Sequence, residues 1–321
     1  MEQYLLRVYV LMSKDSGMDT LELLQKNLGE LEKRGCMGKK MKEQVGTINS
    51  IWQYPVKSMG GLKVAQAILT NDGLLGDRCF ALMDQSGDKV ASAKLPKKWG
   101  RLLNLQASFV ESPKEDKQRT VVRITSTDGL DVLSTDENVD DMLSTFLDRP
   151  VTLTSSRPDT VSLERLDPLD PDGNILDIGE LMLKNKFADY ADVHLLTYST
   201  LNKFAEYSPS VQFDERRFRP NLVVDTGLGA SGFIENGWVG KTIVIGDSVR
   251  LKITDPTPRC SIPTLSNGLL PRDAQVLSTI VEHNRLEVPL LDNKVLPCAG
   301  VYGFVIQGGI VYSGDLVWIE S

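Results

Sequence analysis

Short alternating stretches dominate the chain from Gly46 onward and limit what it can fold into. In VGTINSIWQYPVKSM (45–59) and TVVRITSTDGLDVLS (120–134), apolar and polar residues alternate, and turn signals such as Asp128-Gly129 interrupt them. Successive side chains of a strand point to opposite faces of a sheet, so this pattern predicts half-buried β-strands. Many short strands with few helices predict an α+β, β-rich fold whose sheets close into barrel-like units.

Three segments of different character predict the domain organisation. Residues 1–44 are expected to form a helical leader, because apolar residues recur there at helical spacing, at Leu21, Leu24, Leu28 and Leu31. Residues 45–155 are expected to form one β-rich domain and residues 156–321 a second. A polar, Asp- and Pro-rich stretch, 156–186, lies at their boundary, and a loop of that length is either mobile or functional.

Composition and motifs exclude several classes of protein. A net charge of −7 over 321 residues argues against a general nucleic-acid binder. No stretch approaches the ~20 apolar residues of a membrane helix. There is no GxGxxG, GxxxxGK[ST], GxSxG or HExxH motif, which removes the commonest arguments for a dinucleotide enzyme, a P-loop NTPase, an α/β-hydrolase or a zincin.

The cysteines indicate the compartment and the kind of site. They are scattered, with no CxxC spacing, at positions Cys36, Cys79, Cys260 and Cys298. That spacing argues against a structural zinc site or a four-cysteine iron–sulfur cluster. Scattered cysteines in a chain of this length are typical of reduced thiols, so we expect a cytoplasmic protein.

Four tight turns each carry a basic residue beside a Pro or Gly. They are YPVKS (54–58), GDR (76–78), RFRPN (217–221) and TPRC (257–260). If the fold brings them together, they can bind a phosphate or another oxyanion, with arginine giving bidentate geometry and lysine a point charge. The alternative is four unrelated solvated turns on the surface.

Cys260 allows three interpretations. It is a buried inert thiol, a nucleophile, or a ligand for a soft metal. Arg259 beside it favours the thiolate, which is the form that both attacks and ligates. A nucleophile also needs a base, and nothing in the sequence places His194 or His283, the two histidines, next to it. A ligand for a metal held partly by another molecule needs no second cysteine.

The order of several motifs resembles the MOSC-domain proteins. YPVKS, GLLGDRCFALMD (73–84), FADYADVHLLTYSTLNKF (187–204), FRPNLVVD (218–225) and a single cysteine in PRC follow one another along residues 45–320. More narrowly, they resemble the group that contains the mitochondrial amidoxime-reducing component and its bacterial relatives. The resemblance implies a MOSC β-barrel domain preceded by an N-terminal MOSC β-barrel-like domain.

The resemblance also implies a cofactor and the residues that hold it. The family binds the molybdenum cofactor, Mo-molybdopterin, through a cysteine that ligates the metal, which is Cys260 here. The remaining family positions that would bind the cofactor map onto Lys57, Ser58, Arg78, Asp189, Thr197, Arg219, Asn221, Pro258 and Arg259. Soft sulfur ligation suits a redox metal.

The function that the resemblance implies is a molybdenum-dependent oxidoreductase. It would remove oxygen from a small N-oxygenated substrate, such as an amidoxime or hydroxylamine. Electrons would come from a cytochrome b5-like, ferredoxin-like or flavodoxin-like protein, and Asp255 or Asp189 would supply protons. The loop SIPTLSNGLLPRD (261–273) departs from the amidoxime-reducing relatives, as does Pro258, so the substrate face is expected to differ.

Two alternatives stay open. A non-catalytic cofactor-binding or sulfur-carrier protein would use Cys260 to carry a persulfide. A pyridoxal-phosphate-binding protein would form a Schiff base on Lys57, although one lysine in a motif is a poor signal for that chemistry.

Overall fold

The computed structural model describes residues 42–86, 89–115, 120–160, 162–166, 175–177, 183, 186–227, 229–268 and 270–320. The predicted helical leader, 1–44, lies outside the described residues except for its last three. Residues 43–320 form a single compact unit.

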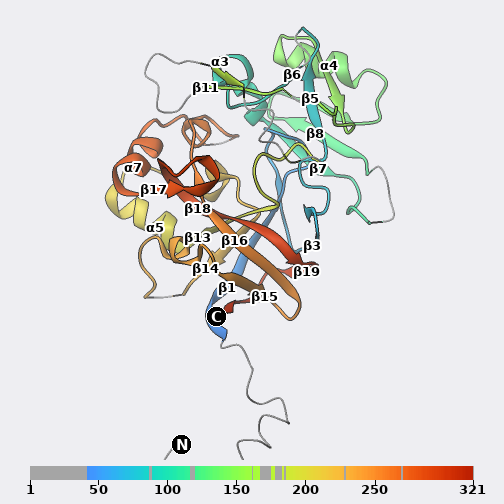
Figure 1. The fold of residues 1–321 in the computed structure, drawn as a ribbon. Coiled ribbons are helices and arrows are strands. Elements are labelled where there is room, and N and C mark those ends of the chain that lie inside the picture. The colour runs from blue at the N-terminus through green and yellow to red at the C-terminus, as the bar shows by residue number, and fades with distance from the viewer. Residues whose placement is uncertain are drawn as a thin grey trace, which may run out of the picture. The chain divides into compact units, whose positions relative to one another are not determined.

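Seven strands of this unit close into a barrel (Figure 1). Around the barrel they run β13 (Val193–Thr197), β14 (Leu222–Asp225), β1 (Lys42–Gln53), β20 (Leu316–Glu320), β15 (Thr242–Ile245), β16 (Val249–Pro258) and β18 (Lys294–Gln307). β13 pairs with β14 in parallel and with β18 in antiparallel, and the second pairing closes the ring. Closure leaves no open edge within the ring, which is why short alternating strands form a stable sheet here.

The interior of the barrel is apolar. Every second side chain of a strand points into the barrel, so the apolar residues of the alternating sequence meet in one core. All seven strands contribute fully buried side chains, at Ile48, Leu195, Leu222, Ile243, Leu251, Val301 and Val317. The predicted α+β, β-rich fold is therefore confirmed.

A second apolar core lies in residues 56–153 and is built on smaller sheets. One sheet runs β10 (Val151–Thr154), β5 (Ala81–Asp84), β6 (Lys89–Val90), and another runs β7 (Leu105–Phe109), β8 (Val122–Ser126), β9 (Asp131–Leu133). The predicted Asp128-Gly129 hairpin is the β8–β9 turn, where Gly129 has φ 93°. The helix α4 (Val139–Leu147) buries Leu143 and Leu147 against this core.

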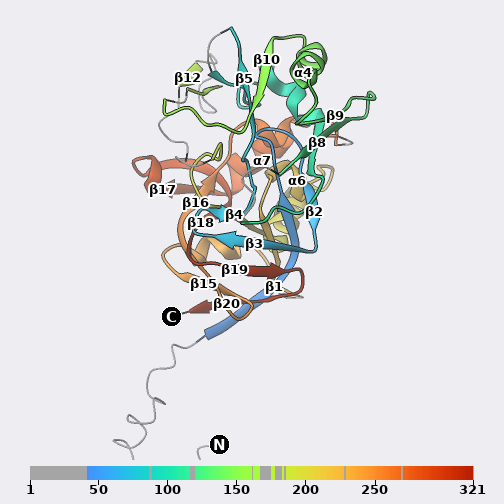
Figure 2. The ribbon, with the colours of Figure 1, turned by 90° about the vertical axis from the view of Figure 1, so that its right-hand side faces the viewer.

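The remaining elements are short. In the view of Figure 2, strand β3 (Gln66–Thr70) lies beside β19 (Gly309–Tyr312) and pairs with it. The others are β2 (Leu62–Val64), β4 (Gly73–Leu74), β11 (Glu164–Leu166), β12 (Ile175–Asp177), β17 (Arg285–Val288), α3 (Pro96–Trp99), α5 (Tyr198–Tyr207), α6 (Glu215–Phe218), α7 (Gln275–His283), and the 3₁₀ turns η1 (Gly100–Asn104), η3 (Ile234–Trp238), η4 (Ile262–Thr264) and η5 (Pro289–Leu291). Within the stretch 156–186, β11 pairs with β12. None of the helices described here is both long and apolar enough to span a bilayer.

Candidate functional site

The basic turns and the Cys260 loop meet at one cavity of about 140 Å³. Nine of the eleven site residues expected from the sequence line it: Lys57, Ser58, Arg78, Asp189, Arg219, Asn221, Pro258, Arg259 and Cys260. They come from the end of β1, the turn before β5, the segment before β13, the turn before β14 and the end of β16. The surface-turn alternative therefore does not hold for these residues.

The other two expected residues, Thr197 and Asp255, do not line the cavity. Thr197 is fully buried, caps α5 by accepting from the Thr200 backbone N–H, and donates to Glu235 Oε2 at 2.6 Å. Asp255 accepts from the Leu290 backbone N–H at 2.9 Å. The Thr197 hydroxyl is thus engaged by Glu235 and by the start of α5, and one oxygen of Asp255 is engaged by the backbone at Leu290.

A half-buried carboxylate between two buried ammonium groups forms one wall of the cavity. Asp189 accepts from Lys57 Nζ and from Lys94 Nζ, each at 2.7 Å. Burial opposes ionisation of Asp189, but the two lysines outweigh it and hold its pKa well below the usual range. Burial lowers the pKa of Lys57 to about 8 despite Asp189. Two ammonium groups against one carboxylate leave a net positive charge.

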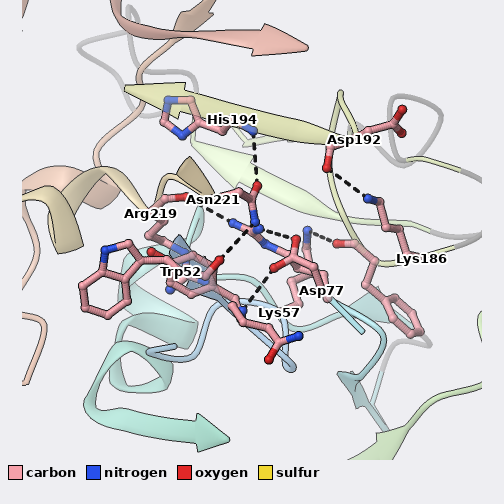
Figure 3. Close-up of polar contacts among 12 residues, drawn as sticks. Trp52, Lys57, Asp77, Lys186, Asp192, His194, Arg219 and Asn221 are labelled. Carbon is pink, nitrogen blue, oxygen red and sulfur yellow. Dashed lines mark hydrogen bonds and ion pairs between the residues drawn. The ribbon is translucent and has the colours of Figure 1, made fainter. Parts of the chain in front are cut away.

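Arg78 and Arg219 form a second wall, and Figure 3 shows Arg219 beside Asn221. Arg78 pairs with Asp77, while the Arg219 guanidinium donates to the carbonyl of Met59. Both arginines have left-handed backbones, with φ of 50° and 55°, and Ser58 has φ 63°. Such strain in non-glycine residues gathers at functional sites.

Asn221 connects the second wall to the barrel. Its Oδ1 accepts from the His194 backbone N–H at 3.2 Å, and its backbone N–H donates to the His194 carbonyl (Figure 3). These bonds hold the turn before β14 against the start of β13. The asparagine thereby fixes the position of Arg219, which lies two residues before it in the same turn.

Cys260 is a half-buried free thiol at the end of β16. The loop is anchored through Arg259, whose backbone N–H donates to the Pro297 carbonyl at 2.8 Å and whose Nη2 donates to the Phe218 carbonyl at 2.9 Å. Burial raises the pKa of both Cys79 and Cys298 to about 12, which keeps those thiols protonated and inert at neutral pH. Among the cysteines in the described ranges, Cys260 is thus the one placed for chemistry.

His194 shares the cavity with Cys260 but is a poor base. Burial, together with Arg259, holds the pKa of His194 well below its usual value, so the ring is neutral. Its Nε2 lies 3.3 Å from the carbonyl oxygen of Ala299. His283 instead stacks on Tyr207, with ring centres 3.7 Å apart. Neither histidine gives Cys260 the partner of a Cys–His hydrolase.

Sequence reasoning missed several residues of the cavity, including Lys94, His194, Tyr190 and Tyr302. Lys94 had a signal, since it stands just before Leu95-Pro96 in the same kind of basic, Pro-bearing turn as the four motifs. Tyr190 and His194 lie within the stretch 187–204 that marks the family resemblance. Tyr302 had no signal, because it lies in the ordinary alternation of β18.

The polar groups of the cavity suit an anionic ligand that accepts hydrogen bonds. Its cations are Lys57, Arg78, Lys94, Arg165, Arg219 and Arg259, whereas Asp189 is the one lining carboxylate among the described residues. Three buried polar atoms at this cavity have no hydrogen-bond partner within the described part of the chain: the Tyr190 hydroxyl, Arg165 Nε and Arg259 Nε. Buried polar groups are normally satisfied, so these atoms point to a missing partner. A pterin with a terminal phosphate fits that donor set.

Comparison with known proteins agrees with this arrangement. Residues 45–150 match the model of the MOSC N-terminal beta barrel domain, and residues 183–318 match the MOSC domain. Mitochondrial amidoxime-reducing component 1 of Homo sapiens is 24% identical, over 88% of this chain and 85% of that protein. Mitochondrial amidoxime reducing component 2 of Rattus norvegicus is also 24% identical, over 86% of this chain and 84% of that protein.

A relative of another kind is the molybdenum cofactor sulfurase of Solanum lycopersicum. It is 28% identical over 74% of this chain, and the chain spans 31% of the sulfurase's own length. The two domain matches together cover most of the chain, in the order that the motifs predict. The chain belongs to the family of MOSC proteins that carry a MOSC N-terminal beta barrel domain before the MOSC domain.

Proposed function

We propose that this protein is a molybdenum-cofactor-dependent oxidoreductase that reduces small N-oxygenated substrates. The observation that carries the proposal is the meeting of the Cys260 thiol with an excess of buried cations and unpartnered donors at one cavity. The amidoxime-reducing relatives support the choice of substrate class. The two matched segments, 45–150 and 183–318, support the proposed division into two domains near the stretch 156–186.

The cofactor would be held by residues with distinct tasks. Cys260 would ligate the metal as a thiolate. Binding of the phosphate and pterin would fall to Lys57, Ser58, Arg78, Arg219, Asn221, Pro258 and Arg259, with Lys94 added from the cavity. When bound, the cofactor supplies a metal that exchanges two electrons, which is the hard part of the chemistry.

The protein's own groups must supply protons and orientation. Reduction of an N-hydroxyl group to an amine consumes two electrons and two protons and releases one water. Asp189 stays ionised between its lysines, so it fixes their ammonium groups and does not deliver protons at neutral pH. Lys57, with a pKa of about 8, is better placed than Asp189 to exchange a proton near neutrality, and Asp255 does not line the cavity.

The outer part of the cavity would receive the substrate. Ile262, Leu291 and Leu296 line it beside Cys260 and give it an apolar side. Ile262 belongs to the loop 261–273, which departs from the amidoxime-reducing relatives. The electrons would arrive from a separate electron-carrier protein of cytochrome b5, ferredoxin or flavodoxin type, in the small and transient kind of encounter usual for such carriers.

The test is the molybdenum and phosphorus content of the full chain purified from a host that makes the cofactor. We expect near-stoichiometric molybdenum in the wild type, its loss in Cys260→Ala, and retention in the matched control Cys79→Ala, whose thiol is half-buried like that of Cys260 but is held protonated and does not line the cavity. The loaded protein should then reduce an amidoxime when given an artificial reductant.

Two outcomes would contradict the proposal. A full molybdenum content in Cys260→Ala would show that Cys260 is not the ligand of the metal. A well-folded wild type without molybdenum, carrying a persulfide on Cys260, would favour the sulfur-carrier alternative suggested by the sulfurase relative.

An absorbance band of a lysine Schiff base would favour the pyridoxal-phosphate alternative. Lys57 already donates to Asp189 and to the Phe187 carbonyl, which does not favour that role.

A further inference from the structure

The guanidinium groups of Arg78 and Arg219 both contact one aromatic ring, that of Tyr54. Tyr54 follows β1 and is 2% exposed. The Cζ atom of Arg78 lies 4.5 Å from the centre of its ring, and the Cζ atom of Arg219 lies 4.4 Å from it. Tyr54 itself does not line the cavity, whereas both arginines do. Any role of the ring is therefore exerted through them.

Holding two guanidinium groups together in a buried place has an electrostatic cost. Burial, and then the charge of Arg78, lower the pKa of Arg219 to about 10. Arg78 has Asp77 as a partner, but Arg219 has no carboxylate partner among the described residues, and its guanidinium donates to a neutral carbonyl. The negative face of an aromatic ring attracts a guanidinium and offsets part of this cost.

The same tyrosine also fixes the backbone around the arginines. Its backbone N–H donates to Asp77 Oδ1 at 3.1 Å, and its carbonyl accepts from the Arg78 backbone N–H at 2.7 Å. Arg78 Nη2 in turn donates to the Arg219 carbonyl at 3.3 Å. The Tyr54 ring also stacks on the ring of Trp52, and the angle between the two ring planes is 19°. Tyr54, Asp77, Arg78 and Arg219 thus form one connected group.

From this geometry we infer that Tyr54 is a positioning residue for an anion site. Its ring holds the Arg78 and Arg219 guanidinium groups in place at the cavity, ready for a multivalent oxyanion such as a phosphate ester. The inference rests on the proposed function, in which that anion is the phosphate of the cofactor. Ordering the two long side chains before binding saves the entropy that binding would otherwise cost.

The Tyr54 hydroxyl makes the inference sharply testable. It is buried and has no hydrogen-bond partner among the described residues. Tyr54→Phe therefore removes no bond and keeps the ring, whereas Tyr54→Leu keeps an apolar side chain and removes the ring. A role in packing alone would require apolar volume, and a role in positioning requires the aromatic face.

The experiment titrates the full chain, purified from a host that lacks the cofactor, with inorganic pyrophosphate in a calorimeter. We expect Tyr54→Phe to bind within threefold of the wild type and Tyr54→Leu to bind at least tenfold more weakly. Leu143→Ala is the matched control, because it opens a buried site on α4 remote in sequence from both arginines. It should lower the melting temperature while leaving pyrophosphate affinity within threefold.

Three results would overturn the inference: wild-type affinity in Tyr54→Leu, equal weakening in Tyr54→Phe and Tyr54→Leu, or no pyrophosphate binding by the wild type. The molybdenum content of the wild type is measured separately. If the protein lacks molybdenum but Tyr54→Leu weakens pyrophosphate binding as expected, the proposed function fails and the positioning role survives.

Discussion

At the scale of single residues, the cavity depends on side chains whose charge is set by burial. Lys57 is 5% exposed and Asp189 accepts from it, yet desolvation dominates and lowers its pKa from 10.5 to about 8. A lysine with that pKa changes charge within the range in which enzymes are assayed. The charge of the cavity is therefore adjustable by pH.

Anion binding should weaken as pH rises through about 8, the pKa of Lys57. Its ammonium loses its proton there, and the anion loses one charge-assisted partner, which we expect to cost roughly tenfold in affinity. Sulfate is a suitable probe, because its own charge stays constant over this range. The measurement is its dissociation constant between pH 6.5 and 9.5.

Lys57→Met is the control for this prediction, since the step near pH 8 should vanish in it. A step of equal size in the variant would assign the titration to another group.

The free energy of unfolding of the protein without a bound anion should change with pH in the opposite direction to the anion affinity. Between pH 8 and 10.5 the unfolded chain holds the Lys57 proton and the folded chain has lost it, so the free energy of unfolding rises with pH.

At the scale of elements, the loop after Cys260 is shaped by a buried arginine on α6. Arg217 is 1% exposed, and its guanidinium donates to the carbonyls of Gln212, Pro263, Leu265 and Pro271. Three of these carbonyls belong to the loop 261–273. That loop has little regular structure beyond η4, so the arginine replaces the hydrogen bonds that a sheet or helix would provide.

Arg217→Met should lower the free energy of unfolding by about 2–4 kcal/mol, because several carbonyls lose their donor at once. Under the proposed function it should also change the substrate preference, since Ile262 on this loop lines the cavity. Chemical denaturation and a panel of N-oxygenated substrates measure the two effects.

The neighbouring Arg216→Met is the matched control for the loop. The Arg216 side chain is 40% exposed and pairs with Asp214, so its loss should cost about 1 kcal/mol or less. If both variants are equally stable and equally selective, the guanidinium of Arg217 does not organise the loop.

At the scale of the whole molecule, β1 connects the two cores. It pairs with β14 and β2 and is adjacent to β20 in the barrel. The chain then continues through Lys57 and Ser58 to Gly60, whose backbone exchanges hydrogen bonds with Leu105 and Ala107 of β7. The cavity residues after β1 are thus held from both sides.

A chain that starts at Lys42 should fold and retain molybdenum, because the closed barrel and all the residues of the cavity lie within 43–320. A chain that starts at Tyr54 should fail to fold, because it lacks β1 and the barrel cannot close. Expression, melting temperature and molybdenum content test both. Loss of folding in the first variant would show that residues 1–41 contribute to the unit.

The sequence by itself determined the strands and part of the cavity. Alternation predicts strands locally, since it reports which face of each strand is buried, and the motif order predicted nine of the cavity residues. Tight turns keep their basic residues beside the strand ends, so Lys57, Arg78, Arg219 and Arg259 reach the cavity wherever those ends meet.

Only the tertiary structure decided the rest. Thr197 lies in a motif like the others and Asp255 lies two residues before one, yet their side chains bond to Glu235 and to the Leu290 backbone. Lys94 joins Asp189, and Tyr54 supports two arginines, across long separations in sequence. The physical reason is that barrel closure and strand register set which distant side chains meet, and neither is written in any local pattern.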